Sequence, residues 1–442
     1  MVWKKLLVLI LVPALGALSG EAMLPKAALA GNALSDNNRF ILTGTNPSVA
    51  PCTTCPDSEY QINFQFSDDE LSDLAANYSH IVMTKYHAKW DLERQFDDAV
   101  RLKQLNPNVK VYMFFIPTVA YFASELYNGT NRHEDWFLHQ GGSRIPFKNV
   151  GYYVDYSNPG FQAWFVDQIV QWAFRPDTNG NQVIDGVLFD LAQIYDLSCM
   201  NSESAACQRV KTLASQVGTA KISALNLGMT KLAAKTRNAL GNDKVVLFNG
   251  IENYDWAQNY SLSLLGYSGG SVNEQFGFYG GAVPKQDMIR YINVPYRFPG
   301  KYFFEKCNLP AMSPDQRSQA LRRVYGCFLL SWQPGYSFFK VGTDYTVQGE
   351  LPTTSYDVPE SHIDFGNPQG KFVTYRAPVN NGVMRRDFEK GYVLVNLESN
   401  NLRVGTTKKI QIYNGNVPGA VYNAGQIMTI PAGDALFCKY VQ

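Results

Sequence analysis

Short apolar segments alternate with amphipathic segments along most of the chain. The apolar segments are rich in β-branched and aromatic residues, which predicts strands. They read as continuous apolar runs, which is typical of parallel strands covered by helices on both faces. The eight segments are residues 60–66, 80–86, 109–116, 183–189, 244–248, 262–276, 301–305 and 327–332.

The segments between these runs predict helices. Residues 67–78 begin with Ser67 and Glu70 at capping-box spacing. Residues 92–105 carry apolar residues at helical spacing and stop before Pro107, and another helix is predicted after Asn158-Pro159. A long helical region reaches Leu240, and a further helix precedes the eighth apolar run.

Eight strands that alternate with helices predict an α/β architecture, and their number favours a (β/α)8 TIM barrel. An open doubly wound sheet is the alternative. No glycine-rich phosphate loop follows the first predicted strand, so the barrel is the better interpretation.

Beyond residue 367 the pattern changes to short strands divided by Gly, Asn and Pro, without a helical stretch. This pattern predicts a small C-terminal antiparallel β-sandwich. The joint falls in the Pro-containing segment 358–368. We therefore expect a barrel domain at 31–366 and a β-module at 367–442.

The first thirty residues have the layout of a secretory signal peptide. Lys4 and Lys5 precede an uncharged apolar stretch at 6–18, and small residues lead to Ala28-Leu29-Ala30. The stretch is short for a membrane span, so an uncleaved anchor is the weaker alternative. We expect residues 1–30 to be removed and the mature protein to be secreted, as a monomer that has no membrane contact after cleavage.

Composition narrows the choice of partners. Lys and Arg (39) nearly balance Asp and Glu (38), so no net charge attracts nucleic acid or anionic membrane. With 45% hydrophobic residues, the chain can bury a large core. The 26 Tyr, 26 Phe and 7 Trp residues can stack on sugar rings or fill that core, so they point only mildly to carbohydrate.

Secretion would permit disulfides among the seven cysteines. Cys199 and Cys207 flank a short polar loop and are the first predicted pair. Cys52 and Cys55 form a CxxC motif, for which a local disulfide is favoured over a redox or zinc site. The odd number leaves at least one thiol unpaired.

The active site of a (β/α)8 barrel lies at the carboxyl ends of its strands. Asp190 follows the fourth predicted strand and Glu274 follows the sixth, and two carboxylates on one rim are what glycoside hydrolysis requires. We predict Asp190 as nucleophile or base and Glu274 as acid/base. Asp190 could instead cap a helix, Glu274 could pair with a basic side chain, and Glu252 is its main rival.

Other side chains at the strand ends are candidates for substrate binding. His87 could equally be a structural hydrogen-bonding residue, and for the aromatic candidates packing is the first interpretation and sugar stacking the second. No motif for a metal centre, a cofactor or a Ser triad is present in the sequence. The predicted binding residues are Lys85, His87, Tyr121, Tyr195, Asn249, Glu252 and Trp332.

The segment before the fourth strand resembles a calcium loop. Asp177, Asn179, Asn181 and Asp185 match EF-hand positions 1, 3, 5 and 9, but Gln182 replaces the required Gly and residue 188 is Leu instead of Glu. A turn that leads into a buried strand explains the same composition without metal. An incomplete, weak calcium site is the minor alternative.

Several segments together resemble the secreted glycosidase barrels of hypothetical glycoside hydrolase family 15. They are HIVMTKYHAKWD, NPNVKVYMFFIP, WFLHQGGSRIPF, YYVDYSNPGFQAWFVDQIV, IDGVLFDLAQIYD, VVLFNGIENY, GGSVNEQFGF and RRDFEKGYVLVNLES. The endo-α-1,4-polygalactosaminidase family is similar at a greater distance. The resemblance covers nearly the whole mature chain, and it implies a (β/α)8 glycosidase in which Asp190 and Glu274 match the catalytic pair.

We therefore expect hydrolysis of an O-glycosidic bond in a polysaccharide, without a cofactor. A carbohydrate-binding barrel that has lost catalysis is one alternative, and a lyase or transglycosidase on the same scaffold is another. The sugar, its linkage and the stereochemical outcome are not specified by the sequence.

Overall fold

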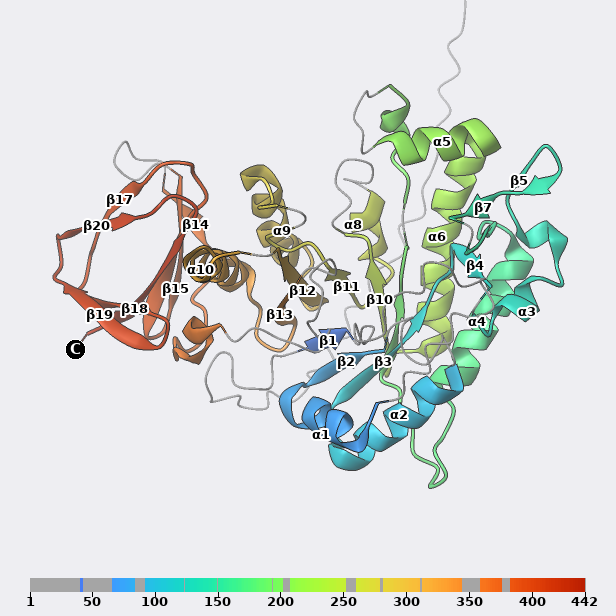
Figure 1. Cartoon of the computed structure of the whole chain (residues 1–442), viewed down its shortest axis with the longest axis horizontal. Helices are drawn as coiled ribbons and strands as arrows, with labels where there is room; N and C mark the ends of the chain where they lie inside the picture. The colour runs from blue at the N-terminus through green and yellow to red at the C-terminus, as the bar shows by residue number, and fades with distance from the viewer. Residues whose placement is uncertain are drawn as a thin grey trace, which may run out of the picture. The chain divides into compact units, whose positions relative to one another are not determined.

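The computed structural model describes most of the chain after residue 65, together with one short strand before it (Figure 1). These residues all belong to one compact unit, Asn32–Gln442. Several predictions concern residues outside the described ranges. They are the signal peptide, residues 60–65 of the predicted first strand, Cys52, Cys55, Lys85, His87 and Glu252. The described ranges are 40–42, 66–83, 92–122, 124–148, 150–192, 194–201, 207–251, 260–278, 281–310, 312–343, 358–375 and 382–441.

Eight parallel strands form the central sheet. Their order in the sheet follows their order in the chain, and the last strand lies in contact with the first, as in a closed barrel. The predicted (β/α)8 architecture is confirmed. The strands are β1 (Phe40–Leu42), β2 (His80–Val82), β3 (Lys110–Phe115), β9 (Gly186–Phe189), β10 (Val245–Asn249), β11 (Gly270–Asn273), β12 (Tyr302–Leu309) and β13 (Ser337–Thr343).

Helices connect the strands and cover the outside of the barrel. The capping box at Ser67 and Glu70 is present at the start of the first helix, and the second helix has the predicted bounds. The helices are α1 (Asp68–Asn77), α2 (Leu92–Leu105), α4 (Pro159–Ala173), α5 (Gln208–Val217), α6 (Thr219–Leu240), α8 (Tyr260–Leu264), α9 (Lys285–Arg297) and α10 (Pro314–Ser331).

The prediction of an eighth strand at 327–332 is wrong. Residues 327–331 form the last turns of α10, and the eighth strand is β13, further along the chain. The run CFLLS is apolar because this part of the helix is buried on all sides, which hides the helical period from the sequence.

The C-terminal region is an antiparallel β-module, as predicted. A six-stranded sheet has the order β14-β15-β16-β21-β18-β19, and the pair β17-β20 packs on one face of it around a buried cluster that includes Val404, Leu394 and Met428. The strands are β14 (Val373–Thr374), β15 (Val383–Phe388), β16 (Gly391–Asn396), β17 (Leu402–Gly405), β18 (Ile410–Asn414), β19 (Val417–Tyr422), β20 (Ile427–Ile430) and β21 (Ala435–Tyr440).

Helix α10 packs against both the barrel and this module, and one hydrophobic core contains side chains from all three. A Cβ atom at Gly326 would lie 2.7 Å from the Cβ of Ala435 and 3.0 Å from Cγ2 of Val395, so glycine permits the close approach of helix and sheet. The buried Arg386 of β15 donates to the backbone carbonyls of Leu329 and Trp332, at 2.9 and 2.7 Å. These bonds satisfy carbonyl groups at the C-terminal end of α10.

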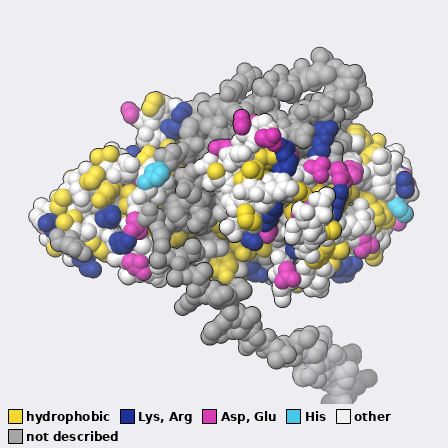
Figure 2. Space-filling model, turned by 90° about the horizontal axis from the view of Figure 1, so that it is seen from below, with side chains coloured by type: hydrophobic (Ala, Val, Ile, Leu, Met, Phe, Trp, Pro, Cys, Tyr) yellow, Lys and Arg dark blue, Asp and Glu magenta, His cyan; other side chains and the backbone are white. Residues whose placement is uncertain are grey.

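The surface carries mixed charge. On the face shown in Figure 2, Lys and Arg side chains lie among Asp and Glu side chains instead of in a separate patch. Within the part of the chain that the structure describes, each helix is too short or too polar to cross a membrane.

Candidate active site

The interior of the barrel is filled by a cluster of apolar side chains drawn from seven strands. Side chains alternate between the two faces of a strand, so the residue two positions further along each strand also points into the barrel. Because parallel strands all end on the same side, these next residues form a layer at the carboxyl-end mouth. The apolar cluster includes Leu188, Leu247, Val272, Phe304 and Phe338, and the next layer therefore contains Asp190, Asn249, Glu274, Lys306 and Lys340.

Asp190 and Glu274 are brought together at this mouth by Asn249. The side-chain amide of Asn249 donates to Oδ1 of Asp190 at 2.9 Å and to Oε2 of Glu274 at 3.0 Å. The two carboxylate oxygens therefore lie at most about 5.9 Å apart. An amide that directs one hydrogen to each oxygen holds the two oxygens roughly 5 Å apart.

The two carboxylates differ in exposure. Asp190 is 6% exposed, whereas the side chain of Glu274 is 29% exposed. An acid/base residue must exchange its proton with solvent or leaving group, and a nucleophile needs only one reacting oxygen at the substrate. The more exposed carboxylate is therefore the better placed of the two for proton transfer.

Two lysines complete the layer. Lys306 and Lys340 are register partners on β12 and β13, and both are buried. The Lys306 ammonium lies 3.3 Å from Oε1 of Glu274, which favours the ionised form of that carboxyl. Burial, together with the positive charge of Lys306, holds the pKa of Lys340 well below its usual range.

The backbone changes direction directly after the candidate residues. Leu191 has a φ of 52°, which is uncommon for a residue with a side chain. Gly250, after Asn249, has a φ of 130°. Strained backbone is often found where a side chain must be held in a fixed position, and Leu191 is consistent with such a constraint on Asp190.

Glu305 lies outside the mouth, although it is the last residue of the predicted strand at 301–305. In register it pairs with Phe339, whose ring packs against Tyr325 and Phe328 of α10 on the outer face of the barrel. Burial raises the pKa of Glu305 to about 8. The alternation of side chains along β12 explains why Lys306, and not Glu305, points inward.

Three of the aromatic candidates have defined places. Tyr121 is 9% exposed and packs with Phe147 beside Leu191, close to Asp190. Tyr195 and Trp332 are 1% and 2% exposed and lie in the two main hydrophobic cores, so packing is the interpretation that their burial fits. A substrate contact of these side chains stays a prediction, as do the roles of Lys85, His87 and Glu252 outside the described residues.

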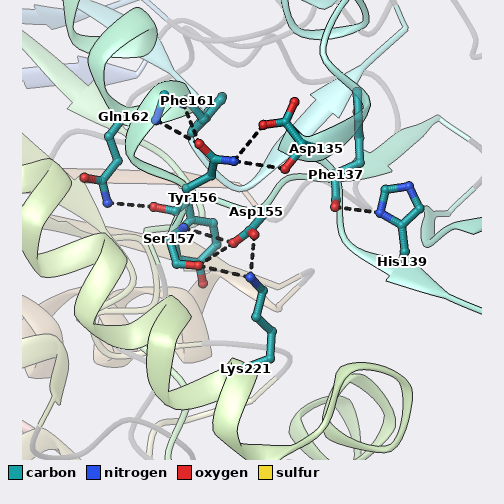
Figure 3. A network of polar contacts seen from close by, with 11 residues as sticks. Asp135, Phe137, His139, Asp155, Tyr156, Ser157, Phe161, Gln162 and Lys221 are labelled. Carbon is teal, nitrogen blue, oxygen red and sulfur yellow. Dashed lines mark hydrogen bonds and ion pairs between the residues drawn. The ribbon is translucent and has the colours of Figure 1, made fainter. Parts of the chain in front are cut away.

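The long segment between β3 and α4, which we call the excursion, forms one side of the mouth. It contains β4 (Val119–Tyr121), α3 (Tyr127–Thr130), β5 (His139–Gln140), β6 (Ser143–Arg144), β7 (Pro146–Phe147) and β8 (Gly151–Tyr153). Figure 3 shows how its end is fixed: Lys221 of α6 contacts both Asp155 and Ser157. In addition, the side-chain amide of Asn158 donates to Asp135 at 3.1 Å. These contacts hold the excursion against α4 and α6.

In the segment that resembles a calcium loop, the carboxylates bond to other groups of the protein. Oδ1 of Asp177 accepts from the backbone N–H groups of Asn179 and Asn181, at 2.8 and 2.7 Å. Asp185 forms ion pairs with Lys103 and Lys110, at 2.7 and 2.9 Å. These bonds account for the polar residues of the segment as a turn that enters β9.

The predicted disulfide between Cys199 and Cys207 is present. It closes the loop that precedes α5, and it is compatible with an extracellular location. Among the described cysteines, Cys307, Cys327 and Cys438 are free and buried.

Lys306 and Lys340 were not among the residues predicted from the sequence. Lysines inside short strands are usually read as surface residues, and the positions of the strands had to be known before their direction could be assigned. The available signal was their spacing of two residues from Phe304 and Phe338, which line the barrel.

The chain is similar to known glycosidases. The model of a family described as hypothetical glycosyl hydrolase family 15 matches residues 103–392. No curated protein matches the chain by sequence.

Solved structures show the same fold at low sequence identity. The α-amylase from Geobacillus thermoleovorans, complexed with acarbose, has a TM-score of 0.51 at 11% identity, with 92% of this chain and 99% of that chain covered. Eubacterium rectale Amy13B has a TM-score of 0.52 at 9% identity, with 93% and 97% covered. At this identity the likeness concerns the fold alone.

Proposed function

The chain belongs to hypothetical glycosyl hydrolase family 15 and is a glycoside hydrolase, and from this premise we propose that it cleaves an O-glycosidic bond in a polysaccharide with Asp190 and Glu274 as the catalytic pair. The observation that carries the proposal is the amide of Asn249, which bonds to both carboxylates at the barrel mouth. We further propose that the protein acts outside the cell, after removal of residues 1–30.

In the proposed mechanism, Asp190 attacks the anomeric carbon of the sugar while Glu274 gives its proton to the departing glycosidic oxygen. The bond to the leaving group breaks as the bond to Asp190 forms. Glu274, now ionised, then takes a proton from water, and the resulting hydroxyl displaces Asp190. One water molecule is consumed, and both carboxyl groups return to their starting states.

Asn249 and Lys306 support this cycle. Asn249 fixes the spacing of the carboxylates through its two N–H bonds. Lys306 stabilises Glu274 when it is ionised, which is its state after the first step. A catalytic acid beside a cation loses its proton more readily, so the same contact limits activity at high pH.

The proposed spacing predicts that the product retains the anomeric configuration of the substrate. Retaining glycosidases have carboxyl groups about 5–5.5 Å apart, whereas inverting enzymes need about 6.5–9.5 Å to admit a water molecule. A library of oligosaccharides screened with the purified mature protein would identify a responsive glycan. Proton NMR of the first product formed from that glycan should show retention.

Inversion in that experiment would contradict direct attack by Asp190. Elongated products in mass spectra of the same reaction would indicate transglycosylation, and the absence of cleavage across a broad library would reject the proposed hydrolysis.

Replacing Lys306 with Met should shift the alkaline limb of the kcat/KM profile to higher pH by roughly half to one unit. Without the cation, Glu274 keeps its proton to higher pH, and activity that needs the protonated acid persists. Burial, the larger cause of the lowered pKa of Lys340, is unchanged in this variant. The groups that face this position in the described mouth are Asp190, Glu274 and Lys340.

The pH profile of Lys408→Met is the control, because Lys408 lies over the ring of Tyr440 in the β-module. A shift of the alkaline limb to lower pH in Lys306→Met would contradict the acid role of Glu274.

A further inference from the structure

A group of aromatic side chains packs against Leu191, and two basic side chains lie over one of its rings. None of them has a role in the proposed cleavage step. Phe147 packs with Tyr121 and Tyr153, with ring centroids 5.6 and 5.2 Å apart. Leu191, which directly follows Asp190, packs against the same cluster. The excursion after β3 therefore forms a wall of the mouth next to the proposed nucleophile.

Two cations converge on the central ring of this wall. The ammonium of Lys148 lies 5.7 Å from the centroid of Phe147, and the guanidinium of Arg209 lies 5.8 Å from it. Lys148 is exposed and Arg209 half-buried, whereas Phe147 is buried beneath them. We call Lys148, Arg209 and Phe147 the basic wall.

The two cations come from different parts of the chain, and each is held in place. Lys148 has a φ of 49°, which directs the side chain by an uncommon backbone conformation. Arg209 is the second residue of α5, immediately after the disulfide at Cys207, and α5 contacts β5 of the excursion. The cation–π contacts with Phe147 further restrict both charged groups.

We propose that the basic wall is a substrate subsite that selects a glycan bearing acidic groups, either carboxylate or sulfate. This inference rests on the proposed function of the neighbouring carboxylate pair. Asp190 is negatively charged when the substrate binds and repels an anionic substrate, so two cations on the neighbouring wall reduce this repulsion and place the acidic group away from the reacting bond. Positively charged groups that are fixed before binding lose little entropy when the substrate binds.

Binding can be measured without cleavage. Isothermal titration calorimetry of the full mature chain, at low salt and 4 °C, would compare three six-sugar probes: oligogalacturonate, sulfated maltohexaose and unmodified maltohexaose. We expect at least one acidic probe to bind about tenfold more tightly than maltohexaose, and added salt to reduce the difference. The two acidic probes distinguish carboxylate from sulfate as the preferred group.

The variant Lys148→Met/Arg209→Met should lose about tenfold in affinity for the acidic probe and little for maltohexaose. Lys408→Met, which removes a lysine over an aromatic ring far along the chain, is the matched control and should bind as wild type. Equal binding of acidic and neutral probes, unchanged binding by the double variant, or no binding of either acidic probe would overturn the subsite.

Hydrolysis is scored separately on the same probes. Selective binding of an acidic probe with no cleavage of any glycan would support the basic wall and reject the proposed hydrolysis. Cleavage of a neutral glycan that depends on Asp190, without preference for acidic probes, would reject the basic wall and leave the hydrolysis standing.

Discussion

Replacing Asp190 with Asn is expected to lower kcat on a responsive glycan by at least about 10³-fold, with binding of that glycan changed only a few-fold. The amide occupies the volume of the carboxylate and keeps an oxygen that can accept from Asn249. It has no negative charge with which to attack or stabilise the anomeric carbon. Steady-state kinetics and calorimetric binding of the variant would measure the two effects.

The matched control is Asp196→Asn, six residues further along the same loop. Asp196 accepts from the backbone N–H of Ser198 at 2.8 Å, and Asn can replace it in that bond, so activity should stay within about twofold of wild type. If Asp190→Asn retained full activity while folding normally, the assignment of the nucleophile would be wrong.

Glu274→Gln should behave differently from Asp190→Asn. Its defect should be large on natural glycans and small on aryl glycosides with good leaving groups, since these need little protonation of the departing oxygen. Azide should accelerate Glu274→Gln by attacking the glycosyl-enzyme in place of water. Azide rescue of Asp190→Asn with retained configuration would instead indicate that the two roles are exchanged.

Replacing Arg386 with Met is expected to reduce the free energy of unfolding by about 3–5 kcal/mol. Arg386 is 4% exposed, and besides its bonds to α10 it donates to the backbone carbonyl of Gly370 at 3.0 Å. Met fills similar volume but leaves several buried carbonyl groups without a donor. Urea denaturation followed by circular dichroism would measure the loss.

Arg403→Met is the control for this change. Arg403 is exposed on β17, so its replacement should alter the free energy of unfolding by less than about 0.5 kcal/mol. Equal stability of wild type and Arg386→Met would mean that the carbonyl groups of α10 find other donors or water.

The fold could be predicted because most of the parallel strands are covered on both faces and therefore appear as continuous apolar runs. Asp190 stands out at the end of such a run, and Glu274 and Asn249 follow in the same way. The inference needed only the rule that parallel strands end on one side of a barrel.

The sequence could not identify the true eighth strand or the inward lysines. The C-terminal half of α10 loses its amphipathic pattern because it is buried between two regions, and β13 contains Lys340, which resembles a surface residue. Successive side chains along β12 point to opposite faces, so Lys306 faces the barrel interior and Glu305 faces the helices. An error of one residue in the assignment of the strand reverses this result.

The close contact at Gly326 also affects how the barrel and the β-module can evolve. Because the barrel and the β-module bury their apolar faces on the same helix, a gene rearrangement that separated them would leave both with an exposed hydrophobic surface. We therefore expect the two regions to be transmitted together among related genes. A larger residue at position 326 should occur only alongside smaller residues at 435 and 395 or a shifted helix, so these positions should change together among related sequences.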